Sequence, residues 1–356
     1  MTIIKPQQAS PFNNKRVFVG IDTHKRSWSV SIRIDAICIK TFSMNPSPDE
    51  LVLFLFKNYL EASYHCVYEA GFGGFWIQES LQSKQIECIV VHVPDIPTSN
   101  KDKDRKNDNN DSKKLALELE LGRIKGIYIP PKQSQTFKTL ARSYHQAVTD
   151  VTRVKNRIKG IVNFYGINLP KHASQWSAKF IRELYSLNLN DSNIRLCLDI
   201  HLDDLVAQKE KQARILKHLK KILEEKEPKL LKRIQSVPGI GLKSAATLIS
   251  EIGDMTRFKS ADELKAFVGF IPSTHSSGET LKESSLTHRK NRFLRKIMVE
   301  SAWVAIRHDK ALTDCFFKLT SRMCKQKAIT RIAKKLLLRL RAVWLGDFNY
   351  ALGVLQ

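Results

Sequence analysis

The N-terminal third of the chain alternates between short segments with strand-like patterning and segments with helical spacing. Residues 16–42 carry β-branched and aromatic residues in alternation, with turn residues between them, which predicts two or three antiparallel strands. Residues 47–62 open with Ser-Pro and continue with helical spacing. Strands are then predicted at 64–71 and 86–94, with a helix over 74–84 between them.

A polar stretch follows the second of these strands. After it the pattern predicts a helix over 111–124 and a short strand over 125–130. Antiparallel strands followed by alternating helix and strand indicate an α/β domain with a mixed sheet. We place this domain at 16–132, behind a flexible tail at 1–15.

From about residue 133 the chain becomes helical. Residues 133–166 read as one long helix without proline, and residues 204–228 repeat isoleucine and leucine at coiled-coil-like spacing, with charges outside. We therefore expect a helical, coiled-coil-like arm over 133–233 that takes part in self-association. The remainder, 234–356, is basic and punctuated by glycine, and predicts a mostly α C-terminal domain.

The net charge of the chain indicates which classes of partner it binds. Its 356 residues carry a formal net charge of +24, with a pI near 9.8, which favours a polyanionic partner. No apolar run is long enough to span a membrane, and the N-terminus lacks the apolar segment of a signal peptide. The six cysteines are scattered, without a CxxC pair, which argues against a zinc site or a disulfide framework. We expect a cytoplasmic, nucleoid-associated protein that binds nucleic acid and no membrane.

Four carboxylates stand at places where catalytic groups are common. Asp22 ends the apolar run VFVGI, and Glu69 ends another predicted strand before small residues. Asp108 and Asp111 are three residues apart at the start of a predicted helix, on one face. Acidic residues also favour helix N-termini for electrostatic reasons alone, so a solvated helix start is the alternative interpretation. Together, the four residues suit a site for Mg²⁺ or Mn²⁺ that acts on phosphodiesters.

The segment SVPGIGLKSAATLISEIG has the pattern of a helix-hairpin-helix motif. Gly239 and Gly241 permit close backbone approach, and the N–H groups of the next helix, with Lys243, can hold a DNA phosphate. The alternative is an ordinary tight turn between two helices.

A serine pair precedes Gly278 in the basic segment 269–309. Read by itself, the pair Ser276 and Ser277 indicates a turn. Beside several cations that could bind phosphates, a serine hydroxyl could instead attack phosphorus, with His275 as its base or its orienting group. The cations are Lys282, Arg289, Lys290, Arg292 and Arg295.

The ordered set of motifs resembles the DEDD transposases of the insertion sequence one-hundred-ten family, relatives of the pilin-gene invertases and RNA-guided bridge recombinases. The motifs are GIDTHKRSWSV, YEAGFGGFWIQESLQ, the region VVHVPDIPTSNKDKDRKNDNNDSKKLA, and a C-terminal stretch that runs from VPGIG through FIPSTHSSGE to RFLRKIMVESAW. The resemblance spans roughly residues 16–345. The segment THRKNRFLRK departs from the family pattern, because it lacks the glycine that is usual there, and Lys290 lies near that place.

The resemblance implies a RuvC-like, RNase H-type fold for the N-terminal domain, with Asp22, Glu69, Asp108 and Asp111 binding Mg²⁺. It implies that Ser277, with Ser276 as the alternative, forms a covalent phosphoserine link to DNA. It also implies donor and target DNA as substrates, a noncoding bridge RNA as guide, and assembly into a dimer or tetramer. Two other functions stay open: a junction-resolving nuclease that uses metal-activated water, and a non-catalytic helix-hairpin-helix DNA-binding protein.

Overall fold

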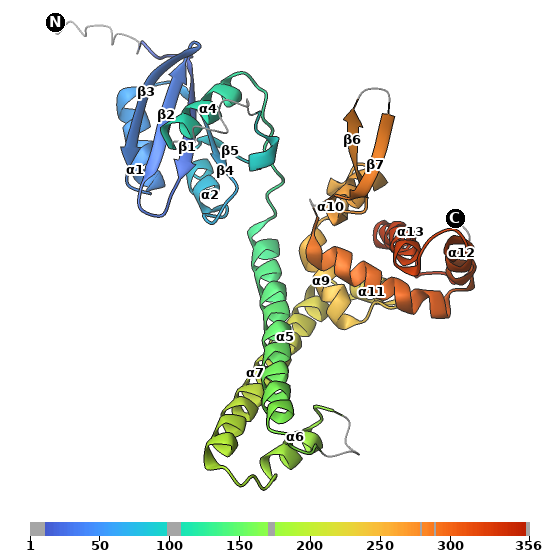
Figure 1. Ribbon diagram of the computed structural model, residues 1–356. Coiled ribbons are helices and arrows are strands. Elements are labelled where there is room, and N and C mark those ends of the chain that lie inside the picture. The colour runs from blue at the N-terminus through green and yellow to red at the C-terminus, as the bar shows by residue number, and fades with distance from the viewer. Residues whose placement is uncertain (1–10, 98–107, 170–174, 278–279, 288–289, 354–356) are drawn as a thin grey trace, which may run out of the picture. The chain divides into compact units, whose positions relative to one another are not determined.

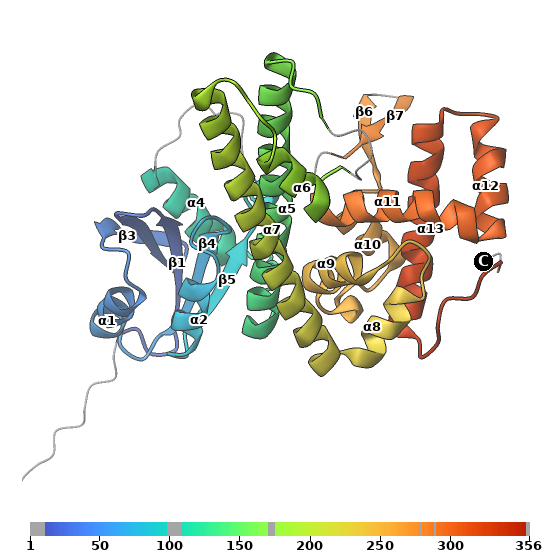
Figure 2. The same ribbon diagram turned by 90° about the horizontal axis from the view of Figure 1, so that it is seen from below.

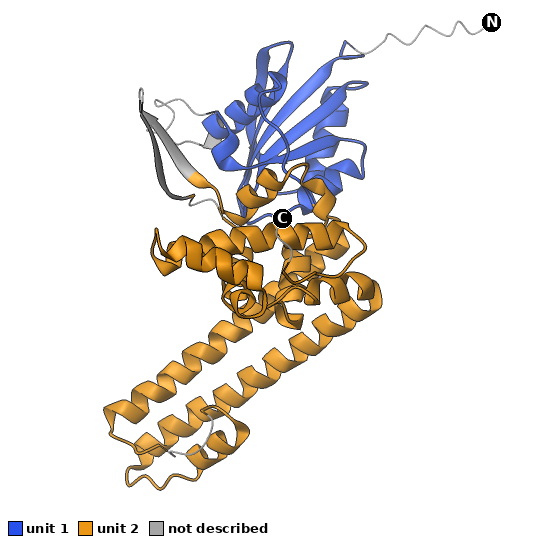
Figure 3. Ribbon diagram, turned by 90° about the vertical axis from the view of Figure 1, so that its right-hand side faces the viewer, with its two compact units in different colours: residues 1–129 blue, residues 130–356 orange. Residues whose placement is uncertain are grey.

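The computed structural model describes residues 11–97, 108–169, 175–277, 280–287 and 290–353. The chain divides into two compact units, residues 1–129 and 130–356 (Figure 3). The long helices and the C-terminal helices belong to the second unit together. The division into tail, α/β domain, arm and C-terminal domain therefore stays a prediction.

The first unit is built on a five-stranded mixed sheet of order β3-β2-β1-β4-β5 (Figure 1). Strand β1 pairs antiparallel with β2 and parallel with β4, β2 pairs antiparallel with β3, and β4 pairs parallel with β5. The strands are β1 Arg16–Thr23, β2 Trp28–Ile34, β3 Ile37–Met44, β4 Ser63–Glu69 and β5 Glu87–Val91. The predicted antiparallel strands and mixed sheet are confirmed.

Helices cover both faces of this sheet. On one face, α1 (Pro48–Asn58) and α2 (Trp76–Gln82) pack against Val19, Ile21 and Tyr68. On the other face, α4 (Asp108–Glu120) packs with Val67 and Val91 (Figure 2). This division follows from the strand repeat, because neighbouring residues of one strand point to opposite faces. A single turn of 3₁₀ helix, η1 (Val93–Asp95), follows β5.

The second unit begins with an antiparallel helical hairpin. Helix α5 (Lys132–Phe164) packs along α7 (Ser192–Lys226), and α6 (Ala178–Tyr185) lies near the end of the hairpin (Figure 1). The start of α5 shares a buried cluster with Leu219, near the end of α7, whereas the end of α5 packs with Leu198, near its beginning.

The C-terminal helices surround the largest buried apolar cluster of the chain. These elements are α8 Pro228–Gln235, α9 Leu242–Ile252, η2 Met255–Arg257, α10 Ala261–Val268, α11 Arg292–His308, α12 Lys310–Thr320 and α13 Lys325–Leu345. A two-stranded antiparallel hairpin of β6 (Pro272–Ser277) and β7 (Thr280–Leu286) stands between α10 and α11. The sequence pattern did not predict this hairpin, because its strands are polar.

The strand predicted at 125–130 is wrong. This segment makes one ladder-like hydrogen bond, from Ile127 N to Val90 O at 2.7 Å, and then reaches Pro130 and Pro131, which have no N–H to continue pairing.

All six cysteines are free thiols, and of these Cys66 and Cys88 are buried. Within the described part of the chain, no helix is both long and apolar enough to cross a membrane.

Candidate active site

Asp22 and Glu69 lie beside each other at the carboxyl edge of two parallel strands. Ile21 of β1 pairs with Tyr68 of β4, so the two acidic residues occupy the next position on each strand. Ile21 and Tyr68 both face α1 and α2, and the strand repeat therefore puts Asp22 and Glu69 on the face covered by α4. The sequence placed both residues at strand ends, and the register adds that they are neighbours on one face.

The Asp22 side chain is only 15% exposed and lies against a histidine. His24 Nε2 is 3.2 Å from Asp22 Oδ2, while the His24 ring itself is half exposed. An aspartate in this position needs polar partners, because burial of a carboxylate without them is costly. His24 lies two residues after Asp22 in the sequence, but its contact with Asp22 was not predicted from the sequence.

Helix α4 approaches β1 unusually closely at Gly20. An ideal Cβ on Gly20 would lie 2.1 Å from the carbonyl oxygen of Ser112 and 2.5 Å from the amide nitrogen of Ala116. Only glycine permits this approach without a shift of the helix. The helix backbone therefore rests directly on the strand two residues before Asp22.

Three serine hydroxyls fix α4 at this point. The buried Ser112 hydroxyl lies 3.1 Å from that of Ser29 and 2.8 Å from that of Ser31. Ser29 pairs with Asp22 across β1 and β2, and Ser31 pairs with Gly20. Ser112 thus links the start of α4 to the strand positions beside Asp22.

The other end of α4 is held by an ion pair. Arg33 Nε donates to Glu120 Oε2 at 2.6 Å, and the Ala36 amide donates to Glu120 Oε1 at 2.7 Å. Arg33 lies opposite Phe18, near the beginning of β1. Helix α4 therefore runs antiparallel to β1, and its N-terminus, which carries partial positive charge, lies toward the strand end that bears Asp22.

Asp108 and Asp111 both belong to the first turn of α4. Asp111 is partly buried and directly precedes the anchoring Ser112, whereas the side chain of Asp108 lies outside the described residues. Among the side chains that the structure describes, no three of the His, Cys, Asp and Glu types come close enough to form a metal site. The structure thus brings Asp22 and Glu69 together and fixes the helix that carries Asp111 over the same face.

The glycine turn of the predicted helix-hairpin-helix lies between α8 and α9. Gly239 has φ of +82°, and a Cβ there would lie 2.6 Å from the carbonyl oxygen of Ser301 on α11. The Ser301 hydroxyl donates to Gly239 O at 3.0 Å. Gly241 is the residue before α9, and Lys243 is exposed in its first turn. This geometry is common to a tight helix–helix turn and to a DNA-binding motif.

The serine pair lies on strand β6. Ser277 is the last residue of β6 and pairs with Thr280, while Ser276 pairs with Leu281 and His275 with Lys282. The side chains of these strand residues lie outside the described part of the structure, as does Arg289 altogether.

The remaining predicted cations lie around the start of α11. Lys290 and Arg292 are exposed on either side of Asn291, and Arg295 is partly buried one turn later.

Two family profiles match the chain, and both describe transposases. A DEDD-type IS110 transposase profile matches residues 19–167, and the Transposase IS116/IS110/IS902 family matches residues 231–316. The first match contains all four predicted carboxylates, and the second contains the glycine turn, both serines and the basic residues.

The chain belongs to the IS110 family of transposases.

Several related transposases support this family membership. A putative transposase of Sinorhizobium fredii is 26% identical over 243 residues, which is 68% of this chain and 58% of the relative. The transposase for insertion sequence element IS1111A of Coxiella burnetii is 26% identical over 219 residues, 60% of this chain and 58% of the relative. A pilin gene-inverting protein of Moraxella bovis is 31% identical over 110 residues, 29% of this chain and 33% of the relative. The chain therefore spans just over half the length of the first two relatives.

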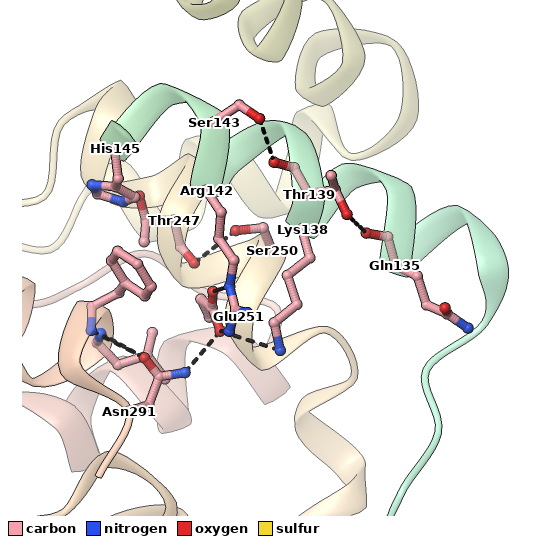
Figure 4. A network of polar contacts seen from close by, with 12 residues as sticks. Gln135, Lys138, Thr139, Arg142, Ser143, His145, Thr247, Ser250, Glu251 and Asn291 are labelled. Carbon is pink, nitrogen blue, oxygen red and sulfur yellow. Dashed lines mark hydrogen bonds and ion pairs between the residues drawn. The ribbon is translucent and has the colours of Figure 1, made fainter. Parts of the chain in front are cut away.

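The IS110-family chain also contains a buried carboxylate that the sequence pattern did not single out (Figure 4). The side chain of Glu251 on α9 is only 1% exposed. Its carboxylate accepts hydrogen bonds from Arg142 Nε at 2.6 Å and from Asn291 Nδ2 at 2.8 Å. It also lies 3.2 Å from Lys138 Nζ. Burial raises the pKa of Glu251, but the Arg142 and Asn291 hydrogen bonds and the Lys138 charge outweigh it and leave the pKa below its usual value. Its partners lie 109 and 40 residues away, so no local pattern could have identified the network.

Proposed function

We propose that this protein is a DNA transposase or recombinase that cuts and rejoins donor and target strands. The observation that carries the proposal is the placement of Asp22 and Glu69 on neighbouring parallel strands, on the face to which the N-terminus of α4 is fixed. Family membership supports DNA as the substrate. The net charge of +24 suits a protein that holds nucleic acid.

We assign the first unit a RuvC-like, RNase H-type fold. The supporting observation is a mixed sheet in which β3, β2 and β1 pair antiparallel while β1, β4 and β5 pair parallel, with Asp22 and Glu69 at the carboxyl edge of β1 and β4. A helix-hairpin-helix role for Gly239, Gly241 and Lys243 belongs to the same proposal, in which the exposed start of α9 contacts a DNA phosphate.

Asp22, Glu69, Asp108 and Asp111 are the residues that would hold Mg²⁺ or Mn²⁺. Their donors are all carboxylate oxygens, which these hard cations prefer. When bound, the metal would stabilise the negative charge that develops on phosphate oxygens. In the chain itself, His24 contacts the carboxylate of Asp22, and the Ser29–Ser112 contact holds the start of α4 over the same face of the sheet.

The proposed nucleophile is Ser277, with Ser276 as the alternative. Its hydroxyl oxygen forms a bond to phosphorus while the bond from phosphorus to one sugar oxygen breaks. The serine proton passes to a base, for which His275 is the candidate, and the released sugar oxygen takes up a proton. A sugar hydroxyl of the new strand then attacks the phosphoserine, which restores the phosphodiester and the free serine. The phosphoserine link keeps the energy of the broken phosphodiester bond, so rejoining the strands needs no further co-reactant.

We further propose that a noncoding bridge RNA selects the donor and target DNA and that the active form is a dimer or tetramer. The α5–α7 hairpin is the candidate element for self-association. Sequence selection by RNA pairing is consistent with a protein whose cations contact the backbone, because phosphate contacts carry no sequence information.

The serine mechanism is tested by trapping the covalent intermediate on labelled DNA in the presence of Mg²⁺. The wild-type chain is expected to form a protein–DNA adduct that resists denaturation, and Ser277→Ala is expected to form none. Ser276→Ala is the matched neighbour and should keep the adduct. Strand exchange that survives Ser277→Ala would exclude this serine, and cleavage without any adduct would favour the nuclease that uses metal-activated water. DNA binding without cleavage, unchanged by Asp22→Ala, would favour a non-catalytic binding protein.

A further inference from the structure

A basic pocket of about 540 Å³ lies between helix α5, helix α10 and the start of α11. Two of its cations come from α5, one lies just before α11 and one is the first residue of α11, and two phenylalanines complete the wall. Its lining residues are Lys138, Arg142, Ala266, Phe267, Lys290, Asn291, Arg292 and Phe293. None of these lining side chains is acidic.

Three of the four cations of this pocket are held by contacts with neighbouring side chains. Glu251, behind the pocket, pairs with both Lys138 and Arg142, as Figure 4 shows. The Phe293 ring is flanked by two guanidinium groups, with Arg142 at 5.6 Å and Arg292 at 5.0 Å from its centroid. Contacts of this kind reduce the entropy that a long cationic side chain loses when it binds a ligand.

The charge of the pocket is strongly unbalanced. Four cations line it, and one carboxylate, Glu251, contacts two of them, which leaves three positive charges in excess. Asn291 caps α11, with its Oδ1 accepting from the Phe293 and Leu294 amides, so the helix N-terminus adds partial positive charge at the same place. Such a site selects a compact anion with several acceptor oxygens.

We propose that this pocket binds one phosphate of a nucleic-acid backbone. Arginine presents a planar fork of donors that matches phosphate oxygens, and lysine adds a point charge. The inference rests on the proposed action on nucleic acid and extends it, because it makes the first turns of α5 part of the nucleic-acid contact. It also gives Lys290, which lies near the departure from the family pattern, a role as one of the four cations.

The test is the salt dependence of binding to the full-length chain, measured by fluorescence anisotropy with chelator present. The variant is Lys290→Ala/Arg292→Ala, in which both side chains are exposed in the wild type. The matched control is Lys310→Ala/Lys318→Ala, which removes the same charge from exposed positions of α12, outside the pocket. A labelled DNA duplex and a labelled RNA of equal length form the two arms, and thermal unfolding verifies that each variant is folded.

For the pocket variant, the slope of log Kd against log salt is expected to fall by about 0.9 on the duplex, or about 0.7 on single-stranded RNA, relative to the control. A change in one arm identifies which nucleic acid occupies the pocket, and a change in both identifies the shared phosphodiester. Equal slopes for the pocket variant and the control in both arms would overturn the proposal. Since no divalent metal is present, loss of strand cleavage cannot affect the result. A chain that binds neither nucleic acid would instead overturn the proposed function.

Discussion

Gly20 of β1 lies directly beneath the backbone of Ser112, so close that a Cβ at this position would be 2.1 Å from the Ser112 carbonyl oxygen. This contact fixes the height of α4 above the sheet. It lies two residues from Asp22 and one residue from Asp111, so it sets the relation between two of the proposed metal ligands.

Gly20→Ala should therefore destabilise the first unit. The methyl group must push α4 away from β1 or distort the strand, and overpacking of this kind costs about 1–3 kcal/mol or more. The measurement is calorimetric unfolding of the full chain, with the transition of the first unit followed separately. Gly160→Ala on α5 is the control: a Cβ there meets nothing within 4 Å, so this change should be neutral or slightly stabilising. Equal unfolding temperatures for the two variants would contradict the close contact.

Ser112→Ala should weaken the attachment of α4 to the sheet without adding a bulkier side chain. The Ser112 hydroxyl is buried and is shared by Ser29 and Ser31, and removal of one member of a buried hydrogen-bonded group costs about 1–3 kcal/mol. Amide hydrogen exchange along α4 is the most direct readout and should become faster. The exposed Ser83→Ala, at the end of α2, serves as the comparison, and exchange in α4 that is equal in the two variants would argue against the anchor.

Much of the first unit could be predicted from the sequence, because its signals are local. The period of two along β1 and β2 and the helical spacing of α1 are properties of neighbouring residues. The contact of Ser112 with Ser29, by contrast, joins residues 83 apart, and nothing in either segment specifies it. The β6–β7 hairpin was not predicted because most residues of its strands are Ser, Thr or charged. The strand predicted at 125–130 does not form because Pro130 ends the segment and Pro131 follows it.

Within the site, the residue types were predictable and the geometry was not. Asp22 and Glu69 were recognisable as carboxylates at strand ends, but only the pairing of Ile21 with Tyr68 places them side by side on the α4 face. The Glu251 network could not be predicted from the sequence, because it joins three helical segments that are far apart along the chain.

Glu251 should make the second unit sensitive to acid. Its folded-state pKa lies below its ordinary value of 4.5, so its contribution to stability is present above that pH and is lost as the pH falls through the folded pKa. Glu251→Gln should lose about 1–3 kcal/mol near neutral pH and show a shallower loss on acidification than the wild type. Denaturant unfolding at several pH values below 6 provides the measurement, with the exposed Glu300→Gln on α11 as control. Parallel stability profiles for Glu251→Gln and the wild type would contradict this role.

Asp309 should be the most sensitive acidic residue of the C-terminal core. Its side chain is fully buried; Arg339 Nη1 donates to it at 2.7 Å, and the Tyr350 hydroxyl donates to it as well. Asp309→Ala leaves the Arg339 charge mostly buried without this partner, which should cost about 3–5 kcal/mol. Asp314→Ala, at an exposed position of α12, should change the unfolding temperature little. A small effect at Asp309 would show that Arg339 finds another partner.

If Asp22 belongs to a metal-dependent site that acts on DNA strands, strand cleavage depends on its carboxylate, and the cleavage rate of Asp22→Asn measures that dependence. Rates are measured on DNA that carries the matching ends, with bridge RNA and Mg²⁺ supplied, and compared with Asp35→Asn, an exposed aspartate in the turn after β2. We expect Asp22→Asn to bind DNA as the wild type does and to lose cleavage by more than about a hundredfold, since even the loss of a group that supports a metal ligand costs 10–100-fold. Asp35→Asn should retain full activity. Cleavage by Asp22→Asn at the wild-type rate would show that Asp22 belongs to no such site.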